Sequence, residues 1–407
     1  MIRRFILAAT GLLITTAAAD AQTIRSTGPV AWGPATRLVE ELRIGALEGD
    51  EAYTFGPVNA IAIGKAGEII VAEYRPARLR MYGANGRLIR TIGGVGSGPG
   101  EYRQISGLKI LPDGSIAIWD AQSGRITVYD NAGQYRTSHS FHTGFFTSDM
   151  FQVDREGNFY VKAAGRRQAP GTFTLDAPII WIKLNSTGAV VDTIPIPQGE
   201  SPSVQTYGGP GKSRIDPLMA ALSPFGYFVT GAPVRYTIDV HRPGGPLRIE
   251  RTHTPVRLAG AERAEWDAMA GYLSRQPIGM SMRRNQSGGT DTIRGPTIKY
   301  AVPETKPVFR ALQVDDDGRI WVERHIAARR VAPVKSAPLT NDPRPPITWR
   351  EPATYDVFEP DGRFLGTVTA PDKTTFHARR GRHIWAVQRG EFDEPYIVRY
   401  RIESAGR

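Results

Sequence analysis

Residues 93–133 read GGVGSGPGEYRQISGLKILPDGSIAIWDAQSGRITVYDNAG. The first eight residues hold five glycines, as a phosphate-binding loop would. However, the segments that follow are short β-branched and aromatic runs on either side of an Asp-Gly turn, and no helical pattern begins there. The stretch also lacks the Lys-Ser/Thr pair of a P-loop and the G-x-G-x-x-G spacing of a dinucleotide site. It therefore predicts a glycine-rich crossing that leads into a series of short antiparallel strands.

The same strand–turn–strand pattern recurs along the chain. It centres on the turn glycines Gly67, Gly114, Gly157, Gly226, Gly318 and Gly381. Asp-Gly, Asn-Gly and Glu-Gly turns supply the positive φ that tight hairpins need. One four-stranded sheet cannot bury both of its faces, whereas six sheets arranged radially can, because each packs on the next. The sequence predicts an all-β, six-bladed β-propeller of four-stranded antiparallel blades, at about 46–92, 105–142, 149–197, 217–253, 307–370 and 372–404.

The sixth unit is one strand short, because it ends near Arg401-Ile402 after three strands. The orphan segment ATRLVEELRIG, Ala35–Gly45, precedes the first unit. We expect this segment to supply the outer strand of the last blade, which closes the ring and removes an exposed sheet edge. Residues 35–404 would then form a single propeller that carries one large insertion, 254–306.

Blade two resembles the NHL-repeat type of six-bladed β-propeller. The stretch GPGEY, followed by IAIWDAQSGRITVYD, is similar to that family's GxGPGxF loop and the strand pair after it. Blade one matches the NHL-repeat pattern apart from its loop. The other blades match this pattern at their turns and strands. The resemblance implies a propeller of the exported bacterial type, but the family's functions are diverse, so it implies little about activity.

The N-terminus has the features of a secretory signal peptide. Arg3 and Arg4 precede the apolar run Phe5–Ala19, and Ala19-Asp20-Ala21 is a small-x-small cleavage site. The run is short for a membrane span. We expect residues 1–21 to be removed, residues 22–34 to form a linker, and the mature protein to be periplasmic or secreted with no stable membrane anchor.

Composition narrows the function classes further. The chain has no cysteine, which excludes disulfides, thiolate metal sites and a cysteine nucleophile. The net charge is +11, but the arginine pairs are scattered and export argues against a nucleic-acid partner. We expect a monomer.

The connections of the predicted blades differ between the two faces of the ring. Turns between first and second strands, and between third and fourth strands, are short and share one face, here the lower face. The upper face carries the insertions 163–177, 197–216, 254–306 and 325–352. Function concentrates on loops held by a rigid scaffold, so we place the site on the upper face; loops that merely cover the channel are the alternative.

Residues 259–275 predict a short helix whose apolar stripe packs onto the propeller as a cap. The stripe consists of Trp266, Met269, Ala270 and Leu273.

Counting from the turn glycines places polar residues around the upper mouth of the central channel. The rim is acidic over blades one to three and basic over blades five and six. The predicted ligand-binding residues are Asn59, Glu73, Asp120, Asp149, Arg310, Arg324, Lys373 and Gln388. The first four carry oxygen ligands of the kind that a divalent cation such as calcium prefers, and no other cofactor is indicated. The alternative is that strand ends are simply polar.

Two function hypotheses follow. The first is a non-enzymatic exported scaffold that binds a protein, peptide or carbohydrate ligand on its upper face. The second is a metal-assisted hydrolase or lyase at the channel mouth. The seven histidines show no metal-ligand spacing. His325, which begins an upper-face insertion, is the one candidate for acid–base catalysis.

Overall fold

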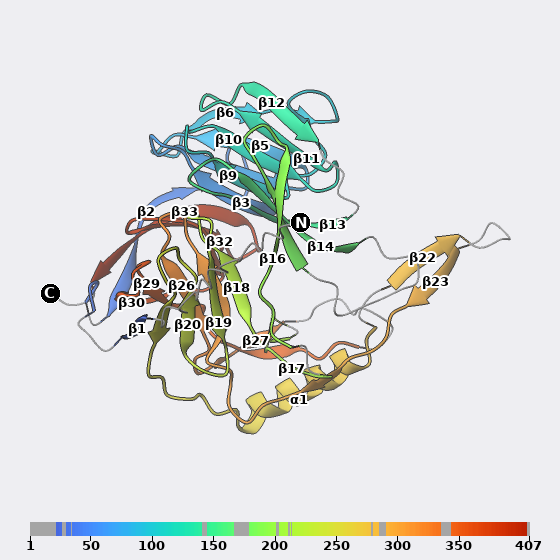
Figure 1. Cartoon of the computed structure of the whole chain (residues 1–407), viewed down its shortest axis with the longest axis vertical. Helices are drawn as coiled ribbons and strands as arrows, with labels where there is room; N and C mark the ends of the chain where they lie inside the picture. Colours follow the sequence, from blue (N-terminus) through green and yellow to red (C-terminus); the bar gives the residue numbers. More distant parts are fainter. Residues whose placement is uncertain are drawn as a thin grey trace, which may run out of the picture.

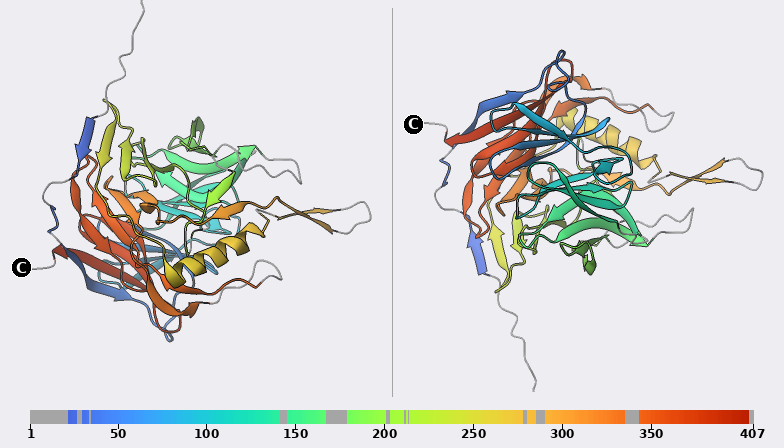
Figure 2. Two further views of the ribbon diagram at one scale, coloured as in Figure 1. Left: turned by 90° about the horizontal axis from the view of Figure 1, so that it is seen from below. Right: turned by 90° about the horizontal axis from the view of Figure 1, so that it is seen from above.

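The strands form six antiparallel sheets that stand side by side around a common axis, a six-bladed β-propeller (Figures 1 and 2). The structure is a computed structural model, and it describes residues 22–26, 30–33, 35–140, 145–166, 179–200, 203–210, 212, 214–277, 280–284, 290–334 and 343–404. The predicted fold class is therefore confirmed.

The first three blades follow the predicted order of strands. Blade one contains β3 (Val58–Ile63), β4 (Ile69–Tyr74), β5 (Ala77–Tyr82) and β6 (Leu88–Ile92). Blade two contains β9 (Gly107–Ile110), β10 (Ile116–Asp120), β11 (Arg125–Tyr129) and β12 (Tyr135–Ser140). Blade three contains β13 (Phe145–Val153), β14 (Phe159–Arg166), β15 (Ile179–Leu184) and β16 (Val190–Pro195).

The last three blades repeat this order with additions. Blade four contains β18 (Met219–Leu222), β19 (Phe228–Ala232), β20 (Thr237–Val240) and β21 (Leu247–Glu250). Blade five contains β25 (Phe309–Val314), β26 (Ile320–Arg324), β29 (Thr354–Phe358) and β30 (Phe364–Thr369). Blade six contains β31 (Thr374–Arg380), β32 (His383–Arg389) and β33 (Pro395–Ser404), together with β2 (Thr36–Ile44).

Strand β2 closes the ring, as the sequence predicts. It pairs antiparallel with β33 from Thr36 opposite Ser404 to Ile44 opposite Ile397, so the two ends of the chain share one blade. Ile44 is buried, and Leu38 and Leu42 pack against the cores on either side of blade six. An edge that would otherwise be open is thus covered by the chain itself.

The stretch expected to be a linker, residues 22–34, contacts three blades. Strand β1 (Gln22–Arg25) pairs parallel with β21 and adds a fifth strand to blade four. Trp32 is buried in the core between blades five and six, with its ring centroid 6.5 Å from that of Trp321. The expected signal peptide, residues 1–21, lies outside the described residues. No helix within the described part of the chain is long and apolar enough to cross a membrane.

The glycine-rich stretch makes a sharp crossing from blade one to blade two. Gly93 has φ +65, and a Cβ there would lie 2.5 Å from the carbonyl oxygen of Gly100, so no other residue fits without a shift. The buried Tyr102 closes the crossing, since its hydroxyl donates to Ile92 O (2.9 Å) and accepts from Leu79 N (3.0 Å). The segment is therefore a structural joint between blades.

Insertions on the upper face combine into one structure, which we call the cap. It comprises β17 (Val204–Thr206), α1 (Gly260–Ser274), β24 (Lys299–Ala301), β27 (Arg329–Val334) and β28 (Ile347–Arg350). β17 pairs parallel with β24, and β27 pairs antiparallel with β28. A hairpin of β22 (Met280–Arg284) and β23 (Thr290–Arg294) extends beyond α1 (Figure 1).

Helix α1 is packed by its predicted apolar stripe. Trp266, Met269 and Ala270 are buried and Leu273 is partly buried. The partners differ from the prediction, which placed this stripe directly on the propeller. They are residues of the insertions themselves: Leu258, Tyr300 and Val302 of the same insertion, Tyr207 of the insertion 197–216 and Ile347 of the insertion 325–352. Three separate insertions therefore share one small core.

Candidate functional site

Glu73, a predicted rim ligand, is buried at the end of β4 and already has its charge compensated. Its carboxylate is 2.7 Å from the Arg80 guanidinium and 3.1 Å from that of Arg78. It also accepts a hydrogen bond from Gly56 N (2.7 Å). Arg80 in turn donates to the Glu51 carbonyl oxygen (2.7 Å). These contacts anchor the loop that precedes blade one.

The other acidic-side candidates also make structural contacts. The buried Asp120 carboxylate accepts from Arg103 N (2.8 Å) and from the Ser123 hydroxyl (2.8 Å). Asn59 Nδ2 donates to Ile105 O (2.8 Å), which joins blade one to blade two. The side chain of Asp149 lies outside what the structure describes. No group of three His, Asp or Glu side chains able to hold a metal occurs among the described residues.

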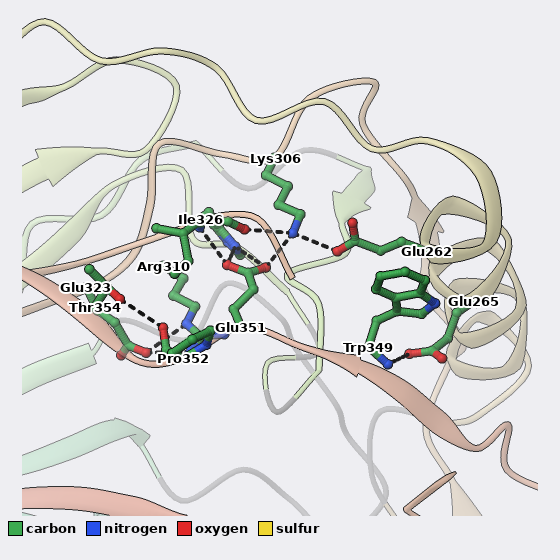
Figure 3. A network of polar contacts seen from close by, with 11 residues as sticks. Glu262, Glu265, Lys306, Arg310, Glu323, Ile326, Trp349, Glu351, Pro352 and Thr354 are labelled. Atoms are coloured by element: carbon green, nitrogen blue, oxygen red, sulfur yellow. Dashed lines mark hydrogen bonds and ion pairs between the residues drawn. The ribbon is translucent and has the colours of Figure 1, made fainter. Parts of the chain in front are cut away.

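The basic candidates of blade five are paired as well. Arg310 binds Glu323, with Nε 2.8 Å and Nη2 2.6 Å from the carboxylate (Figure 3). Arg324 Nε lies 3.3 Å from Asp356, a carboxylate with no exposed surface. Asp356 also accepts from the Tyr236 hydroxyl of blade four (2.6 Å). Burial, and then the Asp356 carboxylate, raises the pKa of Tyr236 well above its ordinary value, so the hydroxyl remains a donor.

The two blade-six candidates lie at the surface. Gln388 Oε1 accepts from Arg43 Nη2 (2.5 Å), a contact that ties β32 to β2. Lys373 adopts φ +53, and its ammonium donates to Gly390 O (2.9 Å). No carboxylate of the described chain lies within ion-pair distance of Lys373. Among the predicted ligand-binding residues whose side chains the structure describes, Lys373 lines a large groove.

This groove, the upper groove, runs between the β27–β28 hairpin and the start of β31. Its volume is about 690 Å³. One part of its lining is apolar: Val331, Ala332, Pro352, Ala353 and Pro371. Another part is polar: Arg329, Arg350, Glu351, Asp372, Lys373, Thr374, Thr375, Arg389 and Asp393. A pocket of this size that combines apolar walls with a few charged groups is typical of a ligand site.

Two of the four basic side chains in the described lining of the upper groove have acidic partners. Arg329 pairs with Asp372 across the groove, and Arg389 pairs with Asp393 (3.0 Å). Arg350 is exposed, and no described carboxylate lies within ion-pair distance of it. Hydrogen bonds, with a contribution from the charge of Lys373, lower the pKa of Glu394, which lies beyond ion-pair distance of Lys373. With four basic and three acidic side chains, the described lining of the groove has an excess of positive charge.

A buried ion network joins Lys306, Glu262 and Glu351 (Figure 3). The Lys306 ammonium has no exposed surface and lies 2.6 Å from Glu262 of α1 and 2.9 Å from Glu351. His325 Nδ1 is 3.1 Å from both oxygens of Glu351. The His325 ring is buried against Trp266, and its Nε2 has no hydrogen-bond partner among the described groups. The network ties α1 to blade five.

Glu351 is expected to make the protein acid-sensitive. Burial opposes ionisation of its carboxyl, but the hydrogen bond and charge of His325 and the ammonium of Lys306 outweigh burial and lower the pKa from 4.5 to about 2. A lowered carboxyl pKa stabilises the fold above the unfolded pKa, and this stabilisation is lost as pH falls towards the folded pKa. The fall in pKa from 4.5 to about 2 amounts to roughly 3 kcal/mol, since one pKa unit corresponds to about 1.4 kcal/mol.

The test compares wild type with Glu351→Gln by urea unfolding across this pH window. The free energy of unfolding of wild type should exceed that of Glu351→Gln by the largest amount near neutral pH. This difference should shrink as pH falls below about 4.5, because the Glu351 carboxyl takes up a proton when the protein unfolds and the Gln side chain cannot. Glu391→Gln, at an exposed turn of blade six, is the control and should show no such trend. If the difference in free energy of unfolding between wild type and Glu351→Gln stays constant with pH, the pKa of Glu351 is not lowered in the folded state.

Sequence reasoning found Lys373 but missed Arg350, Thr374 and the apolar wall of the upper groove. The available signal was the insertion itself, in which Arg329-Arg330 and Arg350 flank a proline-rich stretch. The cross-strand pairing of Arg329 with Arg350 needed the structure.

Comparison with known proteins supports the fold. Residues 37–170 match the family profile DUF5128, described as a 6-bladed beta-propeller. No curated protein sequence matches the chain.

Three solved structures are similar over most of their length. A candidate exported protein of Bacteroides fragilis shares 11% identity over 94% of this chain and 99% of its own, with a TM-score of 0.47. A member of the DUF4221 family from Bacteroides vulgatus shares 11% sequence identity over 91% of this chain and 99% of its own, with a TM-score of 0.49. A gluconolactonase of Xanthomonas campestris shares 12% over 91% of both chains, with a TM-score of 0.40.

Proposed function

We propose that the protein is an exported, non-enzymatic propeller scaffold that binds a ligand or protein partner on its upper face. The observation that carries this proposal is the upper groove, a site of about 690 Å³ between the cap and blade six. Export is supported by the signal-peptide pattern of residues 1–21. The resemblance of blade two supports a propeller of the NHL-repeat type.

The construction of the cap supports binding. Its insertions share a core and are fastened to blade five through Lys306, so one wall of the groove is held on a rigid support. The opposite wall is the inner strand of blade six, β31, which is part of the closed ring. Preformed walls reduce the ordering that a ligand must impose when it binds.

The surroundings of the predicted catalytic groups favour binding over catalysis. His325 is buried between Glu351 and Trp266, away from the groove surface. The rim carboxylates Glu73 and Asp120 are engaged by arginines, backbone amides and a serine. In the part of the chain that the structure describes, these residues hold the loops and the cap in place.

Selection from a random dodecapeptide library against the chain from residue 22 onward tests this proposal. We expect enriched peptides whose binding is lost in Ala332→Trp, because this exposed alanine lines the groove and a tryptophan would fill it. Ala132→Trp, at an exposed lower-face turn, is the matched control and should bind normally. Failure to enrich any peptide, or equal binding by both variants, would overturn the proposal.

A further inference from the structure

We propose that the upper groove selects an acidic peptide segment in which carboxylates flank apolar residues. This inference rests on the proposed upper-face binding function and names its ligand class. Nothing in the chain covers the groove among the described residues, and its lining combines two kinds of surface. The charged groups and the apolar residues of the lining each restrict the class of ligand that fits the groove.

Charge favours a carboxylate-bearing ligand. Arg350 is exposed without a described acidic partner. The Lys373 ammonium donates to a backbone carbonyl oxygen, and its charge also contributes to the lowered pKa of Glu394. Glu351 also lines the groove, but its charge is compensated from behind by Lys306 at 2.9 Å. The net charge of +11 attracts an acidic partner from a distance as well.

The placement of these charges predicts contacts on both walls. Arg329 and Arg350 are cross-strand partners in the β27–β28 hairpin, so they lie on one face of the hairpin. Lys373 and Arg389 belong to blade six on the other side. A guanidinium can hold a carboxylate through two parallel hydrogen bonds, which gives geometry as well as attraction. Acidic side chains on both sides of an extended segment would meet both walls.

The walls favour a peptide over a carbohydrate. Val331, Pro352, Ala353 and Pro371 provide aliphatic surface for small apolar side chains. The described lining contains no aromatic ring, which is the surface on which sugar rings usually stack. The Thr374 and Thr375 hydroxyls can donate to and accept from a peptide backbone. An extended acidic peptide in which carboxylates flank small apolar residues matches these features.

The experiment uses a fluorescein-labelled hexapeptide, Glu-Glu-Val-Val-Glu-Glu, which in an extended conformation presents Glu, Val and Glu on each side. Its counterpart has Gln in place of every Glu. Fluorescence anisotropy is measured with the chain from residue 22 onward. The acidic peptide should bind about tenfold or more tightly than the Gln peptide, and high salt should remove the difference because it screens exposed charges. Arg350→Ala and Lys373→Ala should each weaken binding by about two- to fivefold, as expected for exposed ion pairs. Arg87→Ala, at an exposed lower-face turn, should have no effect.

The outcomes separate the ligand class from the binding function. Equal binding of the two peptides, or wild-type affinity in both Arg350→Ala and Lys373→Ala, would overturn the acidic-peptide assignment. If neither hexapeptide binds while library peptides still lose affinity in Ala332→Trp, the ligand class is wrong and upper-face binding stands. If no peptide responds to Ala332→Trp, both proposals fail.

Discussion

Deleting strand β2, Thr36–Ile44, is expected to unfold the whole propeller and not blade six alone. The deletion uncovers the full length of β33 and removes Ile44, Leu38 and Leu42 from the cores beside blade six. Those cores lie between blades, so their loss loosens blades one and five as well. In a ring of interdependent repeats, each unit is stable only while its neighbours cover it.

Circular dichroism during heating measures this effect. A chain that lacks residues 22–45 should show no cooperative melting transition. The control is a chain that lacks only residues 22–26, because blade four keeps its own four strands without β1. That control should melt cooperatively, at a somewhat lower temperature. Wild-type melting of the longer deletion would show that β2 does not close the ring.

Asp356→Ala is expected to have the largest effect of any single substitution considered. The Asp356 carboxylate has no exposed surface, and it accepts hydrogen bonds from the Tyr236 hydroxyl (2.6 Å) and the Thr367 hydroxyl (2.6 Å). Arg251 and Arg324 each lie 3.3 Å from it. Removing one partner of a buried ionic network leaves the others unpaired and typically costs about 3–5 kcal/mol.

Urea unfolding of purified variants measures the free-energy change. Asp239→Ala is the matched control, because Asp239 pairs with Arg248 at the surface (2.7 Å) and an exposed pair contributes about 1 kcal/mol or less. We expect a loss at least twice as large for Asp356→Ala as for Asp239→Ala. Similar losses would mean that Asp356 is not the link between blades four and five.

The repeat was predictable because turn chemistry is local. Gly67, Gly114 and Gly318 have φ +92, +95 and +87, which other residues rarely adopt, so the turns are visible in the sequence. The sixth unit has three strands where the other units have four, so the orphan segment before the first unit could be assigned as its fourth strand. Strand ends could also be located by counting, which is why Glu73 and Arg324 were found at the ends of β4 and β26.

What a located side chain contacts was not predictable in the same way. Glu73 and Arg324 look like free rim charges in the sequence. In the structure Arg80, on the next strand of the same blade, pairs with Glu73, and Asp356, beyond the insertion 325–352, pairs with Arg324. The upper groove depends on the same kind of long-range information, since Arg329 and Arg350 meet Lys373 only after the cap has folded. The insertions have no repeat from which this arrangement could be read.

Hydrogen–deuterium exchange with a library-selected peptide tests the central claim, ligand binding in the upper groove, most directly. We predict that the bound peptide slows exchange in residues 329–334, 350–353 and 371–375, and leaves the lower-face turns unchanged. Slower exchange instead around the lower pocket of Leu111, Asp113 and Gly157, or no change anywhere at saturating peptide, would contradict the account.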